Sequence, residues 1–343
     1  MRICLATYQS AMLLKGGPRT QIFQTKRALE KLDVEVMLFE SWQDINPDKF
    51  DLIHVFGANI GTYHFVREIH KLGIPFVVSP IIYTRRSSLV VRSVVVADSF
   101  VRKVANGAWT DYGLESEICS WATAIFPNTH REALLVEQGL GISPDRIMVI
   151  PNGVEERFYD GDPALFKQQH GMENFILNVG HIGPKRKNVL ALIRALEHID
   201  HPAVLIGRIE QNEYGNACLQ RAKSNPRLLV LDHLPNDSGM LASAYAASNV
   251  FVLPSQFETP GIAALEAAIA GSKIVITKYG GTEEYFGSYA EYVEPDSVEE
   301  IYHSIQASLQ KEKNNNLREH IRNNFTWDIV GEKTLTAYKA CLS

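Results

Sequence analysis

Short runs of hydrophobic residues alternate with longer amphipathic segments along the chain. In the first half, these runs predict β-strands at residues 2–7, 34–40, 50–57, 74–80, 123–128 and 147–152. Helices are expected at 19–32, where apolar residues recur roughly at helical spacing, and at 61–72 and 130–138. Strands that alternate with helices are typical of a parallel sheet covered by helices on both faces.

The same pattern restarts after a segment at 151–166 that is rich in Gly, Pro and Asp. It predicts strands at 174–182, 203–207, 228–232, 250–254, 273–277 and 291–295, and helices at 187–199 and 325–342. A chain of 343 residues is long enough for two domains. The predicted fold class is therefore α/β, with two doubly wound Rossmann-like domains. Such domains bind ligands at the carboxyl ends of their strands.

Composition and charge exclude several functional classes. A net charge of −5 argues against general nucleic-acid binding. No apolar run approaches the ~18 residues needed to span a bilayer, and the first ten residues are typical of a strand rather than of a signal peptide. We interpret the four cysteines as free thiols in a reducing, cytoplasmic compartment, because Cys4, Cys119, Cys218 and Cys341 show no metal-ligand spacing.

Two segments are locally basic in this acidic protein. The segment 83–105 carries five basic residues and the single acid Asp98, whereas the segment 180–195 carries four basic residues and no acid. The basic residues are Arg85, Arg86, Arg92, Arg102, Lys103, Lys185, Arg186, Lys187 and Arg194. This pattern indicates bound anions of modest size, with a solvated helix face as the alternative for either segment.

A helix is expected after the predicted strand at 250–254. Thr259 and Pro260 mark its start, because Thr is a favoured N-cap and Pro a favoured first helical residue. Gly271 is a suitable residue for its C-terminal end. The first free N–H groups, together with the helix dipole, favour an anion or sugar hydroxyls at this strand end. These N–H groups belong to Gly261 and Ile262.

Two glutamates flank the start of this helix. Glu266 lies about two turns inside, where an unpartnered charge is costly. It either extends to solvent, pairs with an arginine, or accepts hydrogen bonds from two vicinal hydroxyls such as those of a ribose. Glu258, at the tip of the preceding loop, is suited to a second polyol. The strand at 273–277 ends in a Gly280-Gly281 pair, so we expect both loops to open on one edge of the sheet, with a simple hairpin-type turn as the alternative.

A Gly/Pro loop follows the predicted strand that ends at Gly180. Lys185, Arg186 and Lys187 then stand at an expected helix start, where each cation opposes the helix dipole by ~0.3–1 kcal/mol. A bound anion such as a diphosphate explains this arrangement. The motif is neither a P-loop nor a G-x-G-x-x-G fingerprint.

Together, these residues resemble a known family. Glu258 and Glu266 form an E-x7-E pattern, and the stretch FETPGIAALEAAIAGSKIVITKYGGTEE closely resembles the signature of retaining glycosyltransferases of family 4, which are GT-B enzymes that use nucleotide sugars. Similar segments are Gly16-Gly17, VIPNGVEERF at 149–158, VGHIGPKRKN at 179–188 and FTWDIVGEKTLTAYK at 325–339. The resemblance spans the C-terminal domain and the general layout of the N-terminal one.

The resemblance implies a donor-binding role for one group of residues. Glu266 would hold the nucleotide ribose, and Glu258 would contact the transferred sugar together with the amides of Gly261 and Ile262. Lys187 falls at the family's diphosphate-binding lysine. His181 replaces the usual arginine, and Arg186 or Lys185 would supply the missing charge. Gly16 and Gly17 would form the loop that closes over the diphosphate.

The resemblance also implies a domain layout in which two domains face each other across a cleft. Residues 1–152 would bind the acceptor, 153–172 would form a hinge, 173–322 would bind the nucleotide sugar, and 323–343 would form a helix that crosses back to the N-terminal domain.

The activity implied is retaining transfer of a hexose-type sugar from a nucleotide-diphosphate sugar to a hydroxyl acceptor, in polysaccharide, glycolipid or glycoconjugate synthesis. No cofactor or metal is expected, because the D-x-D sequence at Asp160–Asp162 lies in the hinge segment. The N-terminal domain lacks the family's histidine at a strand end, and His54 is expected in the core. Catalysis would then rest on the donor phosphate as proton acceptor and on Lys187.

Two other functions remain open: a nucleotide-sugar 2-epimerase and a non-catalytic nucleotide-sugar-binding protein. The segment 83–105 lies where such enzymes bind the acceptor, so Arg85 and Arg86 are candidate acceptor-binding residues for a carbohydrate or lipid-linked acceptor. Its mixture of valine and arginine is suited either to docking at the inner membrane surface or to a core helix with a charged edge.

Overall fold

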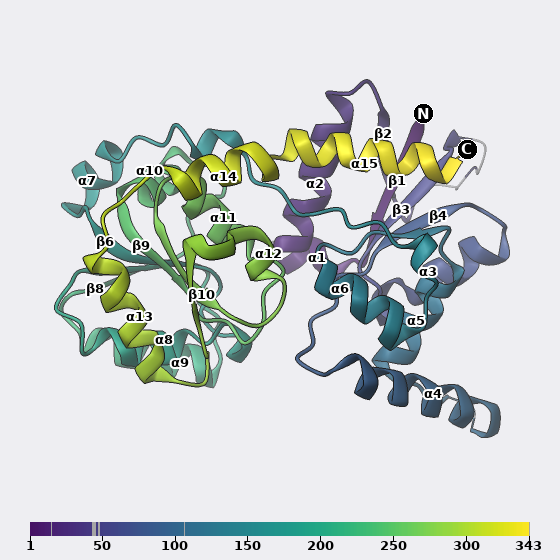
Figure 1. Ribbon diagram of the computed structural model, residues 1–343, viewed down its shortest axis with the longest axis horizontal. Helices are drawn as coiled ribbons and strands as arrows, with labels where there is room; N and C mark the ends of the chain where they lie inside the picture. Colours follow the sequence, from purple (N-terminus) through teal and green to yellow (C-terminus); the bar gives the residue numbers. More distant parts are fainter. Residues whose placement is uncertain (15, 43–45, 47–48, 106, 343) are drawn as a thin grey trace. The chain divides into compact units, whose positions relative to one another are not determined.

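The computed structural model describes residues 1–14, 16–42, 46, 49–105 and 107–342, and the chain divides into two compact units (Figure 1). The first unit comprises Met1–Gly153 and Trp327–Ser343, and the second comprises Val154–Thr326. Most of the segment expected to be a hinge, residues 154–172, thus lies within the second unit. Among the described residues, no helix combines the length and the apolar character needed to cross a bilayer.

The first unit is built on a five-stranded sheet of order β2-β1-β3-β4-β5, in which all neighbouring pairs are parallel. The strands are β1 (Arg2–Thr7), β2 (Glu35–Leu38), β3 (Leu52–Phe56), β4 (Phe76–Ser79) and β5 (Ala124–Ile125). The strand predicted at 147–152 is wrong. Ile147 forms only an isolated bridge with Ile125, because Pro127 has no N–H with which to continue the ladder.

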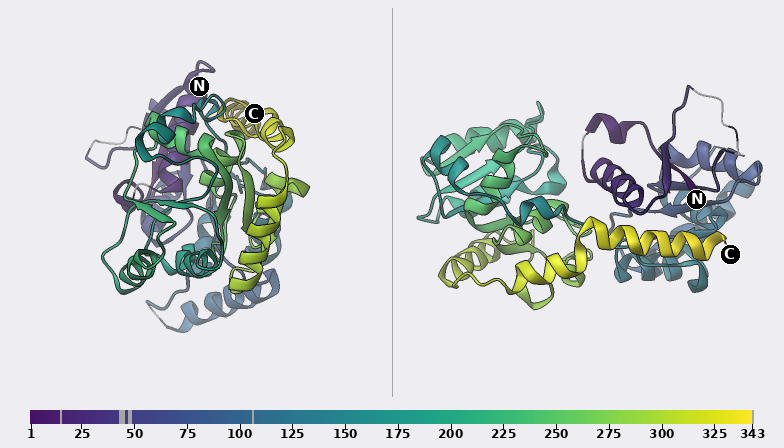
Figure 2. Two further views of the ribbon diagram at one scale, coloured as in Figure 1. Left: turned by 90° about the vertical axis from the view of Figure 1, so that its left-hand side faces the viewer. Right: turned by 90° about the horizontal axis from the view of Figure 1, so that it is seen from above.

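Hydrophobic cores lie on both faces of this sheet. Along β3, Ile53 and Val55 join one buried cluster, whereas Leu52 and Phe56 join the other. The first cluster is covered by α3 (Ile60–Lys71), α4 (Ser88–Val104) and α5 (Asp111–Trp121), and the second by α2 (Gly17–Glu30) and α15 (Trp327–Leu342). Figure 2 shows these helices around the sheet.

The second unit contains a six-stranded parallel sheet of order β11-β10-β9-β6-β7-β8. Its strands are β6 (Phe175–Val179), β7 (Ala203–Ile206), β8 (Leu228–Leu231), β9 (Ser248–Leu253), β10 (Lys273–Thr277) and β11 (Ala290–Val293). The chain runs from β6 outward to β8 and then returns to the other side of β6 to begin β9. The strand order therefore reverses between β6 and β9.

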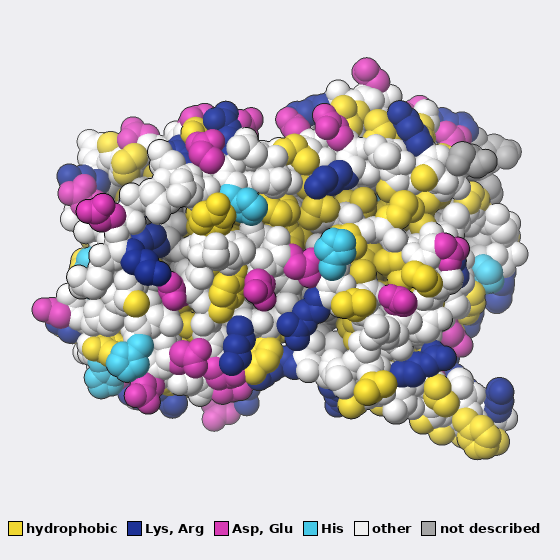
Figure 3. Space-filling model, in the orientation of Figure 1, with side chains coloured by type: hydrophobic (Ala, Val, Ile, Leu, Met, Phe, Trp, Pro, Cys, Tyr) yellow, Lys and Arg dark blue, Asp and Glu magenta, His cyan; other side chains and the backbone are white. Residues whose placement is uncertain are grey.

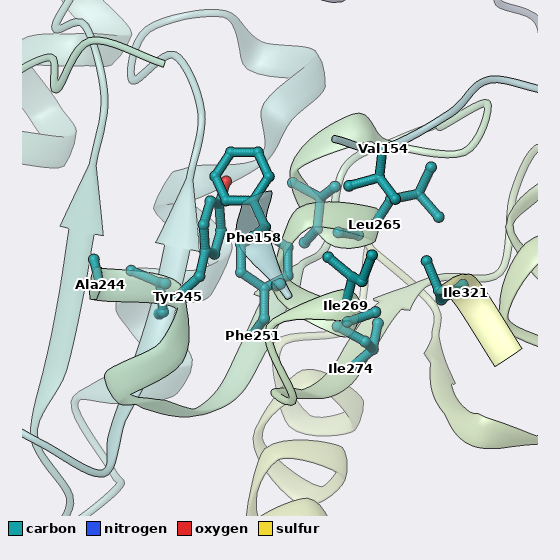
Figure 4. Close-up of a cluster of buried hydrophobic side chains, with 14 of the residues drawn as sticks. Val154, Phe158, Ala244, Tyr245, Phe251, Leu265, Ile269, Ile274 and Ile321 are labelled. Atoms are coloured by element: carbon teal, nitrogen blue, oxygen red, sulfur yellow. The ribbon is translucent and has the colours of Figure 1, made fainter. Parts of the chain in front are cut away.

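Two clusters also fill the second unit. Phe175 and Leu177 of β6 face one cluster, and Ile176 between them faces the other. Helices α10 (Gly239–Ala247), α11 (Ile262–Ile269) and α14 (Asn316–Phe325) cover the first cluster, and α8 (Val189–Leu196), α9 (Glu213–Lys223) and α13 (Val298–Gln310) cover the second. Leu265 and Ile269 of α11 point into the same cluster as Tyr245 (Figure 4). Each unit is thus a doubly wound α/β domain, as predicted.

Short helical elements complete both units. The first unit contains α1 (Ser10–Leu14), α6 (His130–Leu134), a π-helix (Leu135–Leu140) and a 3-10 turn (Pro144–Arg146). The second unit contains α7 (Ala164–His170), α12 (Thr282–Phe286) and 3-10 turns at Glu156–Phe158, Lys185–Lys187 and Gly287–Tyr289.

The last helix is joined to the first sheet by a buried polar contact. His54 of β3 is 2% exposed, with Nδ1 2.6 Å from the Tyr338 hydroxyl of α15 and Nε2 2.9 Å from Ser79 Oγ. Burial lowers the pKa of His54 to about 3, so the ring is neutral at physiological pH. The prediction that His54 belongs to the core is confirmed.

Candidate active site

The candidate site of the second unit lies where its strand order reverses. In open α/β sheets, ligands bind beyond the carboxyl ends of the strands at such a reversal. Lys187 lies in the loop that follows β6, and Glu258 lies in the loop that follows β9. The two strands are also joined by a side chain, because Asn178 Nδ2 donates to the Val252 carbonyl at 2.7 Å.

Lys187 and Glu258 form an ion pair at this position. Lys187 Nζ lies 2.6 Å from Glu258 Oε1, and the two side chains are 19% and 6% exposed. Burial alone would raise the pKa of Glu258, but the charges of Lys187 and Arg186 lower it below its usual value. The carboxylate is therefore ionised at neutral pH and is matched by a cation 71 positions away in the sequence.

This pair corrects two sequence-based expectations. The basic run was predicted to start a helix without an opposing acid, whereas Lys185–Lys187 form a separate 3-10 turn and Glu258 supplies the acid. Asn188, with φ 55°, separates that turn from α8. The cations therefore do not occupy the first turn of an α-helix, and the argument from the helix dipole does not apply to them. Glu258, which was predicted at the tip of its loop, is buried there, at 4% exposed.

Backbone and amide contacts hold the Lys187 loop against the Glu258 loop. Asn188 Nδ2 donates to the carbonyls of Pro254 at 3.0 Å and Pro295 at 2.6 Å. The Gln256 N–H donates to the Arg186 carbonyl at 2.7 Å. The basic turn is thus fixed relative to the ends of β9 and β11.

The loop after β10 lies against the same glutamate. Glu258 and Gly280 form an isolated parallel bridge, in which the Glu258 N–H donates to Tyr279 O and the Gly281 N–H donates to Glu258 O. Gly280 has φ 103°, and a Cβ there would lie 1.9 Å from the Glu258 carbonyl oxygen. The expectation that the loops after β9 and β10 open on one edge of the sheet is confirmed. A helix, α12, follows the glycine pair in place of the alternative hairpin-type turn.

The start of α11 differs from the prediction. The helix begins at Ile262 rather than Pro260, because Gly261, with φ 82°, is the N-cap in place of Thr259. A Cβ on Gly261 would lie 2.7 Å from Leu253 Cδ2 and 3.5 Å from Glu258 Oε2. The N–H groups of Gly261 and Ile262 precede the first hydrogen bonds of the helix, which the N–H groups of Ala264 and Leu265 donate to Gly261 O. The predicted end at Gly271 is confirmed by its φ of 95°.

Glu266 is buried in α11 and accepts hydrogen bonds from two neutral groups. The Tyr245 hydroxyl donates to Oε2 at 2.7 Å, and Asn236 Nδ2 donates to Oε1 at 3.1 Å. Glu266 is 4% exposed, so the expectation that it extends to solvent is wrong. Burial raises the pKa of Glu266 to about 7, although both hydrogen bonds and the charge of Arg157 act in the opposite direction.

Replacement of Glu266 by Gln is expected to change the pH dependence of stability. Because the folded-state pKa is raised from 4.5 to about 7, this carboxyl group stabilises the fold below pH 4.5, and its contribution is lost as the pH rises through 7. The shift corresponds to roughly 3 kcal/mol. We expect the unfolding free energy of the wild type minus that of Glu266→Gln to fall by this amount between pH 4.5 and above 7. Urea unfolding of both proteins across this range measures it, and a constant difference would contradict the assignment.

The other residues that were predicted to bind the sugar donor lie in both units. His181 is half-buried after β6, with Nδ1 3.9 Å from Glu210 Oε1, and burial lowers its pKa. In the first unit, Gly16 is the N-cap of α2 and Gly17 is the first residue of that helix, within the connection that follows β1. The structure thus brings Lys187, Glu258 and the start of α11 together in the second unit. Gly16 and Gly17 belong to the first unit.

The candidate acceptor residues precede α4 in the first unit. The guanidinium of Arg86 lies 5.8 Å from the centre of the Tyr112 ring, and the backbone N–H of Arg86 donates to Thr84 Oγ1 at 3.1 Å. Arg85 is exposed.

Within the described part of the chain, no group of three or more His, Cys, Asp and Glu side chains is placed to hold a metal ion. In the D-x-D sequence, Asp162 Oδ1 accepts the N–H of Ala164 at 2.9 Å.

Residues 163–326 match the family described as Glycosyl transferases group 1. The matched segment lies within the second unit and contains Lys187, Glu258 and Glu266. The candidate site therefore lies in a segment with the sequence pattern of group 1 glycosyl transferases.

Curated relatives agree with this match. The chain is 25% identical over 217 residues to an uncharacterised glycosyltransferase from Methanocaldococcus jannaschii, covering 58% of this chain and 55% of the relative. It is 27% identical over 245 residues to a D-inositol 3-phosphate glycosyltransferase from Geodermatophilus obscurus, covering 66% of this chain and 54% of the relative. The chain thus spans about half the length of these relatives.

Solved structures show the same fold over the whole chain. Sucrose-phosphate synthase from Thermosynechococcus elongatus has a TM-score of 0.74 and 17% identity, covering 99% of both chains. The Anabaena protein HepE, solved in complex with UDP, has a TM-score of 0.72 and 16% identity, covering 99% of this chain and 100% of HepE. The two-domain α/β fold of the GT-B type is therefore confirmed. The matched family model and the two curated relatives are all described as glycosyltransferases.

Proposed function

We propose that the protein is a retaining glycosyltransferase that moves a sugar from a nucleotide-diphosphate sugar to a hydroxyl acceptor without a metal ion. The observation that carries the proposal is the Lys187–Glu258 pair at the strand-order reversal of the second unit, within the segment that matches the group 1 family. The UDP bound to HepE, a protein of the same fold, supports a nucleotide-sugar donor.

In this proposal Lys187 stabilises the departing diphosphate. The bond between the anomeric carbon and the diphosphate oxygen breaks while the acceptor oxygen bonds to the same face of the sugar. The acceptor proton passes to the departing phosphate oxygen, so no protein base is required. Because Lys185, Arg186 and Lys187 outnumber Glu258, the turn keeps a net positive charge toward an anion. Glu258 and the amides of Gly261 and Ile262 orient the transferred sugar.

Glu266 accepts the two hydroxyls of the nucleotide ribose in this proposal. Each carboxylate oxygen can accept two hydrogen bonds, and Tyr245 and Asn236 use one on each oxygen. One acceptor position therefore remains on each oxygen for a vicinal diol. The two neutral donors also hold the Glu266 carboxylate in one orientation, whereas a mobile side chain would have no fixed orientation.

The first unit supplies the acceptor side of the reaction in this proposal. Gly16 and Gly17 approach the donor diphosphate, and Arg85 and Arg86 bind a carbohydrate or lipid-linked acceptor. The pathway would be polysaccharide, glycolipid or glycoconjugate synthesis at the cytoplasmic side of the membrane. An O-antigen chain mannosyltransferase from Escherichia coli, 26% identical over 188 residues and aligned over 52% of this chain and 49% of its own length, supports that setting.

A donor-binding screen tests the proposal. UDP-, GDP- and ADP-sugars are titrated into the protein by calorimetry in the presence of EDTA, and we expect one nucleotide class to bind. At pH 8.5, where Glu266 with its pKa of about 7 is ionised, Glu266→Gln should weaken that binding about 10- to 100-fold, because a hydrogen bond to a charged group is worth ~1.5–3 kcal/mol.

Glu299→Gln is the matched control, since this glutamate of α13 is 84% exposed and should leave donor affinity unchanged. Slow donor hydrolysis, with the α or β configuration of the released sugar read by NMR, tests the retaining outcome. Absence of binding by every donor, or an unchanged affinity of Glu266→Gln, would overturn the donor-site assignment.

A further inference from the structure

Helix α4 exposes a continuous apolar stripe. Leu89, Val96, Phe100 and Val104 are 81%, 53%, 68% and 75% exposed, and their spacing of seven, four and four residues places them on one helix face. Val91, Val95 and Asp98 on the other side are buried. Figure 3 shows apolar side chains gathered over α4.

The sequence left two interpretations of segment 83–105, a helix that docks at a membrane surface and a core helix with a charged edge. The exposure of the apolar side chains of α4 distinguishes between them. A core helix would bury its large apolar residues, whereas only one face of α4 packs against the unit. Contiguous exposed apolar side chains mark interaction surfaces in soluble proteins. The stripe thus needs a partner that the first unit itself does not provide.

The charges beside the stripe identify that partner as anionic. Arg92 and Lys103 are exposed and lie next to the apolar face at helical spacing. The one acid of the helix, Asp98, is buried, lies 2.6 Å from Arg102 and accepts the Thr110 N–H at 2.6 Å. The exposed face therefore carries positive charge only, in a protein of net charge −5.

We propose that α4 docks the protein on the surface of an anionic lipid bilayer. The helix lies in the plane of the interface, with Leu89, Val96 and Phe100 among the acyl chains and Lys103 against lipid phosphates. A helix of 17 residues with an apolar stripe and a cationic edge has the form of an interfacial helix. Because the apolar face provides the binding area, a free phosphate or soluble anion would leave it uncovered.

Charge also argues against a second copy of the chain as the partner. A two-fold pairing through the stripe would bring Arg92 and Lys103 of both copies together without an exposed acid on the helix to offset them. Lipid headgroups offer the opposite charge. The inference goes beyond the proposed transfer reaction and does not depend on it, since bilayer binding requires no donor.

Vesicle flotation of the full chain tests the proposal. We expect the protein to float with vesicles of equimolar phosphatidylcholine and phosphatidylglycerol, to stay behind with pure phosphatidylcholine, and to dissociate in high salt. The double substitution Leu89→Ser/Phe100→Ser should lower the partition coefficient at least tenfold. Lys103→Glu should lower it about tenfold, as the headgroup attraction becomes repulsion.

The matched control is Ile60→Ser/Leu72→Ser, which removes two apolar side chains that are 53% and 70% exposed at the ends of α3. It should float like the wild type. Circular dichroism and donor calorimetry verify that all variants are folded. Equal flotation with both vesicle types or of all variants would overturn the proposal. A different result would also overturn it: the protein does not float, sedimentation shows that it self-associates, and Leu89→Ser/Phe100→Ser abolishes this self-association. In that case a second copy of the chain would be the partner.

Discussion

Lys187→Ala is expected to lower kcat about 10²- to 10³-fold. The ammonium group is the charge closest to Glu258 in the candidate site, and loss of one preorganised group that stabilises a departing anion typically costs ~3–4 kcal/mol of barrier. The same substitution leaves the buried carboxylate of Glu258 without its nearest cation, so we expect the pKa of Glu258 to rise. Initial rates of sugar transfer or donor hydrolysis at saturating donor measure the effect.

Lys185→Ala is the control for charge in the same turn. Lys185 is exposed and belongs to the same 3-10 turn, so its removal changes the net charge equally and should alter kcat less than threefold or so. Lys187→Arg should recover part of the activity, because it retains the charge with a different geometry. If Lys187→Ala and Lys185→Ala have equal rates, the specific role of Lys187 is wrong.

Gly280→Ala is expected to lower the unfolding free energy by about 3–4 kcal/mol and to impair transfer. The left-handed conformation at φ 103° costs a residue with a Cβ ~1–2 kcal/mol. The new Cβ would also lie 1.9 Å from the Glu258 carbonyl, so the bridge between the two loops must open, at ~1 kcal/mol for each of its two hydrogen bonds. Urea unfolding and the transfer rate measure the two effects.

A second glycine separates backbone conformation from the clash. Gly271 has φ 95°, yet a Cβ there would meet no heavy atom within 4 Å. Gly271→Ala should therefore cost only the conformational part, ~1–2 kcal/mol, and leave transfer intact. Equal stability of the two variants would mean that the close approach of Gly280 to Glu258 does not matter.

The strands of the second unit were predictable because buried parallel strands are short continuous apolar runs. The predicted strand at 250–254 overlaps β9, and the run at 273–277 coincides with β10. The run at 147–152 has a similar sequence, but its partner strand β5 ends at Ile125, two residues before Pro127, and a local pattern does not show the pairing partner. The local sequence pattern therefore identifies an apolar run, but the neighbouring strand determines whether that run forms the hydrogen bonds of a sheet.

The candidate site was predictable only as a set of positions. Motif spacing selected Lys187, Glu258 and Glu266, but the ion pair joins residues 71 positions apart. Likewise, Tyr245 and Asn236 were missed because no local spacing connects them to Glu266, from which they are 21 and 30 positions away. The start of α11 was misplaced because Thr259-Pro260 has the composition of a helix start, whereas Gly261 takes a conformation that no helix residue has.

The contact between His54 and Tyr338 has a consequence for synthesis of the chain on the ribosome. The sheet face that includes Phe56 is covered by Trp327, Val330 and Tyr338, which are translated only after the whole second unit. At typical rates of translation, roughly 10 to 30 seconds pass between synthesis of this sheet and synthesis of the helix α15 that covers it. The first unit begins to fold first but becomes complete last, so during that interval its exposed apolar face is a natural binding surface for chaperones.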